Sequence, residues 1–259
     1  MLIHEQHMPN HARYTPPATL HMIWLIAWRQ MDEAVRNRST LILAGFSVIF
    51  PLVIVLFSLR DVMTATSPSE RIFVGTIMAF YLLWAGLMPS TPAIGIASGV
   101  FAGDKERGCL TPLLVTPASN TALFAGKVLG SVLPALALSL IAILAYLAEI
   151  ALLFGFDKLA LLPLGLTLLI LLAIPAITIF GTGLASIISS RVTTFQAAQN
   201  YSSLILVVLW VGLFGLLFAA SAWGLWTFAL GILAIFVLDA LLIAIAAATW
   251  KREEVMGKQ

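Results

Sequence analysis

The sequence has little cysteine, histidine and charge, and each shortage excludes a class of protein. Cys109 is the only cysteine among 259 residues, so the chain can form neither an intrachain disulfide nor a cluster of thiolate ligands. All four histidines lie in the first 21 residues, which excludes a histidine-held haem or metal centre in the rest of the chain. His4, His7 and His11 have helical spacing, but Pro9 interrupts it, so we interpret residues 1–18 as a flexible polar tail.

The charges that are present predict neither a nucleic-acid site nor a catalytic site. The formal net charge is only +2 and no basic patch is interleaved with aromatic residues, so we expect no nucleic-acid partner. No serine–histidine–aspartate set, carboxylate pair or metal cluster can be assembled at one membrane depth. A phosphate-binding loop is missing as well, because Gly126-Lys127 is followed by Val128 and lacks the earlier glycine. We expect no catalytic residue, metal or cofactor in this chain.

Long apolar runs dominate the sequence instead. Hydrophobic residues make up 61% of the chain and charged residues 10%, a balance that predicts membrane spans rather than a soluble domain. The runs are continuous and do not alternate as barrel strands do, so they predict helices. The fold class is therefore expected to be an all-α integral membrane protein, with its transmembrane domain over residues 19–259. Hydropathy places the six spans at residues 41–59, 72–101, 128–154, 161–188, 201–222 and 226–250.

Two segments near these spans need separate interpretation. Residues 19–38 predict an amphipathic helix in the membrane surface, because Trp24, Trp28 and Met31 share one face while Arg29 and Glu33 lie on the other. Only residues 223–225 separate the last two spans, which leaves open a short re-entrant stretch there.

The positive charges predict how the chain is oriented. With the N-terminus in the cytoplasm, 11 of the 14 lysines and arginines lie on the cytoplasmic side, and only Arg60, Arg71 and Lys158 lie outside. An odd number of spans would move the three C-terminal cations outside, so the bias favours an even number. Both termini and the polar segment 102–127 are then cytoplasmic.

Segment 102–127 is a polar segment between two of the apolar spans. Four consecutive charges, at 104–107, are followed by Leu110, Leu113 and Leu114, which share one helical face between Pro112 and Pro117. A short apolar helix flanked by charge suits a groove on a soluble partner. An ordinary solvated loop is the alternative, and we favour the docking helix.

This segment resembles a motif of ABC-2 type permeases, the membrane subunits of ATP-driven exporters. The family pattern is EKExGTLExLLxTPxS followed by Gly-Lys, and residues 104–119 read DKERGCLTPLLVTPAS, followed by Gly126-Lys127. The sequence departs at Asp104, Cys109 and Thr111, where the family has Glu, Thr and Glu. The layout of a surface helix, six spans and cytoplasmic termini is also similar to that family.

The resemblance implies an exporter in a bacterial or archaeal inner membrane. It implies a second permease copy or a paralogue, surrounding membrane lipid, and a cytoplasmic ATPase subunit that binds ATP and Mg²⁺. The matching positions would couple to that ATPase, and Thr111 puts one polar contact in doubt. The coupling residues it implies are Asp104, Lys105, Glu106, Arg107, Gly108, Leu110, Leu113, Leu114 and Pro117.

Two acids within the spans are candidate residues of a translocation path. Asp239 lies near the centre of the sixth span and Glu149 near the outer end of the third, so no direct pair is expected. Ser139 or Thr178 is placed to offer Asp239 a hydroxyl. A path or dimer-interface role and a neutral, hydrogen-bonded packing role remain open for both acids.

Three alternatives to a general exporter permease follow from these features. A lipid or polysaccharide exporter of the same superfamily is one, and aromatic residues along a dimer interface would favour a glycan path. A proton-driven secondary transporter that uses Asp239 is the second. A membrane-embedded enzyme or scaffold is the third, and it would act without an ATPase.

Overall fold

Every regular element that the structure describes is a helix. The computed structural model describes residues 19–60, 63, 67–108 and 119–249. The helices in chain order are α1 (Thr19–Arg36), α2 (Arg38–Leu59), α3 (Pro68–Leu87), α4 (Ser90–Glu106), α6 (Asn120–Phe154), the 3₁₀ helix η2 (Phe156–Leu161), α7 (Leu164–Arg191), α8 (Phe195–Trp223) and α9 (Leu225–Thr249).

Six helical stretches in the described residues are long and apolar enough to cross a membrane. They are α2, the pair α3–α4 taken together, α6, α7, α8 and α9. The predicted all-helical fold with six spans after a separate first helix is confirmed. The second span is interrupted at Met88 and Pro89, where the Ser90 hydroxyl donates to the Leu87 carbonyl oxygen at 2.6 Å.

Polar capping residues set where four of the helices begin. Each cap side chain accepts a hydrogen bond from a backbone N–H group in the first turn. The caps are Asn37 before α2, Ser67 before α3, Ser119 before α6 and Thr194 before α8. Because Ser119 starts α6 at Asn120, residues 120–127 are helical, although hydropathy assigned them to the polar segment between two spans.

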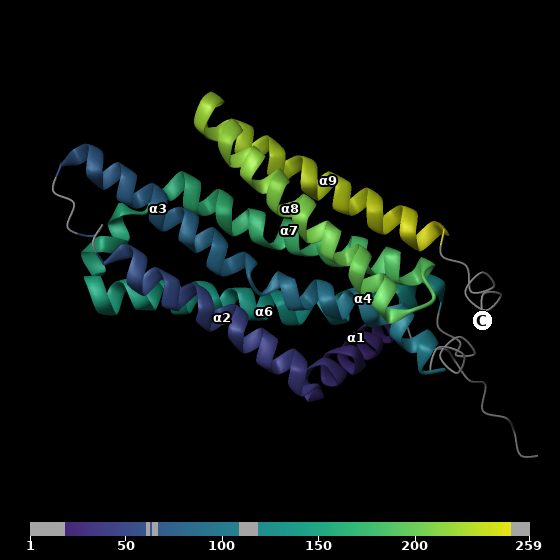
Figure 1. The fold of residues 1–259 in the computed structure, drawn as a ribbon. Coiled ribbons are helices and arrows are strands. Elements are labelled where there is room, and N and C mark those ends of the chain that lie inside the picture. Colours follow the sequence, from purple (N-terminus) through teal and green to yellow (C-terminus); the bar gives the residue numbers. More distant parts are fainter. Residues whose placement is uncertain (1–18, 61–62, 64–66, 109–118, 250–259) are drawn as a thin grey trace, which may run out of the picture.

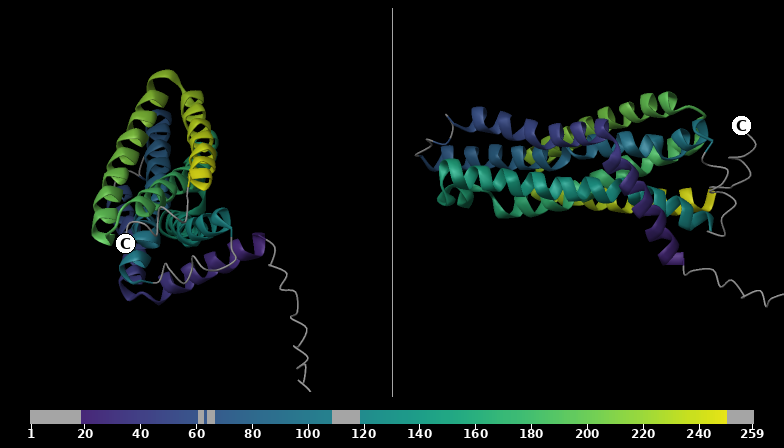
Figure 2. Two further views of the ribbon diagram at one scale, coloured as in Figure 1. Left: turned by 90° about the vertical axis from the view of Figure 1, so that its right-hand side faces the viewer. Right: turned by 90° about the horizontal axis from the view of Figure 1, so that it is seen from below.

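The described chain begins and ends at the same end of the bundle (Figure 1). We call this the α1 end; it also holds the start of α2, the end of α4, the start of α6 and the end of α9. The opposite end holds η2 and the turn between α8 and α9 (Figure 1). Helix α1 lies across the bundle and packs mainly against α6 (Figure 2).

A single glycine joins the last two spans. Helix α8 continues to Trp223 and α9 begins at Leu225, so only Gly224 lies between them. Gly224 has a φ of +99°, a conformation that side-chain-bearing residues rarely adopt. The chain therefore reverses at Gly224, with no room for the re-entrant stretch that the sequence left open.

The largest cluster of buried apolar residues in the described part of the chain includes residues of α3, α6 and α7. Tyr146 of α6 is fully buried and its hydroxyl donates to the Met78 carbonyl oxygen of α3 at 2.7 Å. Helix α4 packs against α6, α7 and α8. Much of α8 and α9 carries exposed apolar side chains, as expected of helices that face lipid or another subunit.

Candidate functional site

Four consecutive charged residues at the end of α4 each contact a different helix. We call Asp104, Lys105, Glu106 and Arg107 the α4 junction. Their partners lie on α6, at the end of α7, at the start of α8 and on α1 respectively. Successive residues of an α-helix point about 100° apart, so four in a row sweep almost the whole circumference. All four can find partners because helices surround this end of α4.

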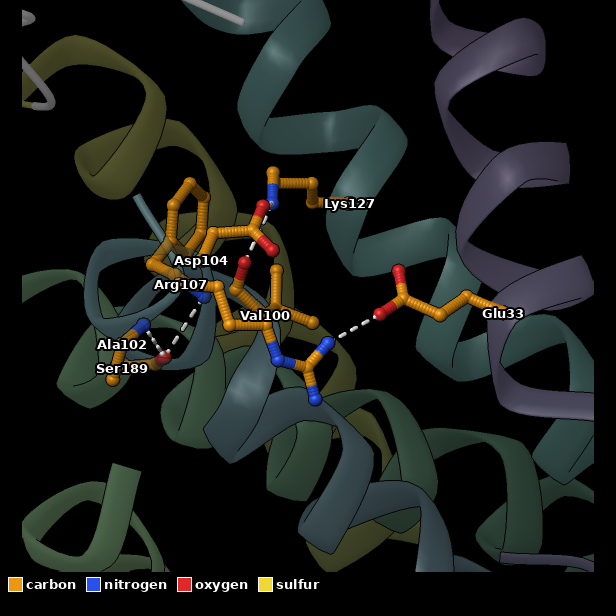
Figure 3. Close-up of polar contacts among 8 residues, drawn as sticks. Glu33, Val100, Ala102, Asp104, Arg107, Lys127 and Ser189 are labelled. Carbon is orange, nitrogen blue, oxygen red and sulfur yellow. Dashed lines mark hydrogen bonds and ion pairs between the residues drawn. The ribbon is translucent and has the colours of Figure 1, made fainter. Parts of the chain in front are cut away.

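Asp104 pairs with Lys127, a lysine that is only 2% exposed. The Lys127 Nζ donates to Asp104 Oδ2 and to the Val100 carbonyl oxygen, each at 2.5 Å, and lies 5.0 Å from the centre of the Phe101 ring (Figure 3). A buried ammonium is tolerated only when such partners replace its lost water. Lys127 therefore fixes α6 against the last turns of α4.

Lys105 contacts the C-terminal end of one helix, and Glu106 contacts the N-terminal end of another. The Lys105 Nζ donates to the carbonyl oxygens of Ser190 and Val192, at 2.8 and 2.9 Å, where α7 ends. Glu106 Oε1 accepts the backbone N–H of Phe195, the first residue of α8, at 2.9 Å. Helix C-termini carry partial negative charge and N-termini partial positive charge, so both contacts are favourable.

A serine of α7 adds a contact to the α4 backbone. Ser189 is fully buried, and its Oγ accepts the N–H groups of Phe101 and Ala102 at 3.0 and 2.9 Å (Figure 3). Small side chains let membrane helices approach closely enough for such bonds. The α4 and α7 backbones are consequently held together just before the junction.

The contact between α4 and α1 is more exposed. Arg107 donates to Glu33 Oε1 at 2.7 Å, with the two side chains 65% and 47% exposed (Figure 3). Gly108 follows with a φ of +66°, and its N–H donates to the Lys105 carbonyl oxygen at 3.1 Å. This left-handed glycine ends the helix.

Four predicted coupling residues are not part of this geometry. Leu110, Leu113, Leu114 and Pro117 belong to segment 109–118, which lies outside the described residues, as does the docking helix predicted there. That prediction stays a prediction. Segment 109–118 nonetheless connects α4 to α6, the two helices that Lys127 and Asp104 join.

The two intramembrane acids are not brought to the α4 junction. Asp239, on α9, is 5% exposed, and neither of its carboxylate oxygens has a hydrogen-bond partner among the described residues. Glu149 lies near the end of α6 that is far from α1, and its Oε2 atom also has no hydrogen-bond partner among the described residues. Thr178 donates instead to the Ile174 carbonyl oxygen of its own helix, and the Ser139 hydroxyl finds no partner among these residues.

Sequence reasoning missed the role of three residues that build the site. It placed the four charges against water or a partner protein and did not consider contacts between the end of α4 and Glu33, Lys127 or Ser189 of the same chain. Lys127 gave the clearest signal, because an amine directly before an apolar run needs a carboxylate and Asp104 lies upstream. Within the described residues, no group of three or more His, Cys, Asp or Glu side chains could hold a metal ion.

The sequence profile of the ABC-2 type transporter family matches residues 21–211, from α1 into α8. The match covers well over half of the chain and includes the α4 junction. The chain belongs to the ABC-2 type transporter family. This protein is therefore a membrane permease, and the predicted relationship to this family is confirmed. No curated protein matches the permease sequence.

Proposed function

We propose that this permease, together with a second copy or a paralogue, forms the path by which a substrate is exported, and that a separate cytoplasmic ATPase drives it. ATP and Mg²⁺ bind to that ATPase in this scheme. The observation that carries the proposal is the α4 junction, where one helix end contacts four other helices directly before segment 109–118. The family match supports an ATPase partner.

In this proposal the α1 end of the bundle lies in the cytoplasm and both chain termini are cytoplasmic. The distribution of cations supports this orientation, because Arg60, Arg71 and Lys158 are near the opposite end while the other described lysines and arginines are near the α1 end. The amphipathic helix α1 then lies at the inner surface of a bacterial or archaeal plasma membrane, with the exposed rings of Trp24 and Trp28 toward lipid.

The junction offers a physical route from the ATPase to the spans. A displacement of segment 109–118 pulls on α4 and α6, which the Lys127–Asp104 pair makes move together. Lys105 and Glu106 carry the displacement of α4 to the ends of α7 and α8. Coupling between distant sites requires a connected set of packed and hydrogen-bonded elements of this kind. Closure of two ATPase subunits would thus move several spans at once.

The test is whether an apolar-to-acidic change in segment 109–118 releases the ATPase. We expect Leu113→Asp to abolish co-purification of the ATPase from mild detergent while the permease still inserts into the membrane, because a carboxylate cannot enter an apolar groove. Phe156→Asp is the matched control, since Phe156 is 75% exposed on η2 at the opposite end. Unchanged co-purification of Leu113→Asp would refute the coupling role.

A second candidate function, proton-driven transport, is favoured by one observation. Asp239 is a buried acid whose carboxylate oxygens have no partner among the described residues, which leaves it able to bind a proton or a ligand. That transporter would work without an ATPase. A lipid or polysaccharide cargo is an alternative within the exporter class and changes nothing in the coupling scheme.

A further inference from the structure

A cavity of about 390 Å³ lies beside the α4 junction. Residues of α1, α2, α4 and α8 line it, and its volume is in the range of small-molecule sites. Gly95 and Gly103 of α4 form part of its wall, and a Cβ atom added at either glycine would have no neighbour within 4 Å. The space beside these two glycines is therefore open.

The charged side chains around the cavity are mainly acidic. Among its described lining residues, Glu33, Asp104 and Glu106 are acids and Arg107 is a cation. Glu33 and Asp104 already have ion-pair partners, whereas no salt bridge joins Glu106 to a cation in the described part of the chain. Glu106 uses Oε1 to accept the Phe195 N–H. The cavity thus favours a positively charged group near Glu106.

A continuous track of aromatic rings crosses α2, α3 and α8. Neighbouring ring centres along it are 5.0 to 6.3 Å apart, within the range of direct ring contact. We call it the aromatic track; in order, its rings are Phe46, Phe50, Trp84, Tyr81, Phe80, Phe214 and Trp210. The rings of Phe46 and Phe214 are 58% and 50% exposed, so these parts of the track face outward from the bundle.

The cavity and the aromatic track lie on one face of the molecule. On α2, Leu43 lines the cavity and Phe46 and Phe50 follow three and seven residues later, which is the spacing of one helical face. On α8, Gln199 lines the cavity and Trp210 follows eleven residues later, about three turns further along that face. The track therefore continues from the cavity toward the opposite end of the bundle.

We propose that this cavity is the loading site for a small cationic amphiphile, with an amine or quaternary ammonium group held near Glu106 and an apolar or aromatic body passing onto the aromatic track. Cations bind the faces of aromatic rings, so the track serves both parts of such a molecule. The acidic lining disfavours an anionic head group. Aromatic rings also suit a glycan, but the cavity holds a small group rather than a polymer. The inference rests on the proposed exporter function.

The experiment uses the permease purified with its ATPase in nanodiscs, and radiolabelled tetraphenylphosphonium as the probe. Tetraphenylborate is the control ligand, because it has the same four rings and the opposite charge. We expect saturable binding of the phosphonium to the wild type. Gly95→Leu should weaken it at least tenfold by filling the cavity, and Glu106→Gln should weaken it several-fold while keeping an acceptor for the Phe195 N–H.

Gly212→Leu is the matched control variant. A Cβ atom at Gly212 also has no neighbour within 4 Å, and this residue lies two positions from both Trp210 and Phe214, on the opposite face of α8. Phosphonium binding should therefore be unchanged in this variant. If Gly95→Leu and Gly212→Leu weaken phosphonium binding equally, or if neither weakens it, the assigned site is overturned.

Two other outcomes would overturn the ligand class. Tetraphenylborate binding that is as tight and as sensitive to Gly95→Leu would show that the site does not select cations. Binding of maltoheptaose in place of the phosphonium would indicate a glycan path. Co-purification and ATP hydrolysis of the same complex report on the proposed function separately: if they persist while phosphonium binding is absent, only the loading site is refuted.

Discussion

One buried ionisable residue lies beside the α4 junction and another lies in the middle of α9, and the two residues have opposite surroundings. Lys127 contacts a carboxylate, a carbonyl oxygen and an aromatic ring, whereas Asp239 has no hydrogen-bond partner among the described residues. A buried charge supports a fold only when partners replace its water. The difference separates a residue that fixes how two helices meet from one whose polar atoms remain available to a proton, a ligand or a second subunit.

The largest effect is expected from Lys127→Met, which removes the amine and keeps an unbranched side chain. Asp104, whose side chain is 20% exposed, then loses the cation beside it. Removing one partner of a buried ion pair costs about 3–5 kcal/mol, and the partial exposure of Asp104 favours the lower end of that range. The measurement is the free energy of unfolding of the purified permease in mild detergent.

The control for this prediction removes the second charge as well. In Lys127→Met with Asp104→Leu, no carboxylate is left without its cation, so we expect more than half of the lost stability to return. Coupling to the ATPase should not return, because the joint between α4 and α6 is still missing. A double variant that is as unstable as the single one would show that Asp104 is not the cause.

An intermediate effect is expected at the exposed side of the same junction. Arg107→Glu places a carboxylate next to Glu33, and exposed pairs are worth about 0.2–1 kcal/mol. We expect a loss of stability of that size, its recovery when Glu33→Arg is added, and its decrease at high salt. Thermal unfolding at low and high ionic strength measures all three. If Arg107→Glu lowers the stability as much as Lys127→Met does, then burial does not set the size of these two effects.

The sequence predicts the spans better than it predicts the junction. Long apolar runs place six spans because lipid requires about 20 apolar residues for each crossing. Hydropathy does not show where helices begin, since the caps Ser67, Ser119 and Thr194 are polar and add a turn or more before the apolar run.

The partners of the junction are the part that one sequence cannot supply. Glu33 is 74 residues from Arg107, and Phe195 is 89 residues from Glu106. Which helices surround the end of α4 depends on packing between distant segments, and no local pattern encodes it. The four consecutive charges suggested contact with water or a partner protein rather than contacts with four separate helices of the same chain.

The smallest effect on stability is expected from Asp239→Asn, which keeps the shape of the side chain and removes its ability to carry a charge. No hydrogen-bond partner among the described residues is lost, so the free energy of unfolding should change by less than about 0.6 kcal/mol, the average worth of a polar contact between membrane helices. Thermal unfolding beside Lys127→Met gives the direct comparison. A loss of several kcal/mol would mean that Asp239 has a partner in the assembled transporter.

Transport by the same variant decides between the two candidate functions. If ATP hydrolysis drives export, inside-out vesicles with Asp239→Asn should accumulate tetraphenylphosphonium on addition of ATP at close to the wild-type rate. A proton-driven transporter must load and release a proton at Asp239 in each cycle, and an amide cannot do so, so transport would stop and added ATP would not restore it. Lost transport with undiminished ATP hydrolysis would instead make Asp239 part of the substrate path, because the motor would then run without moving its cargo.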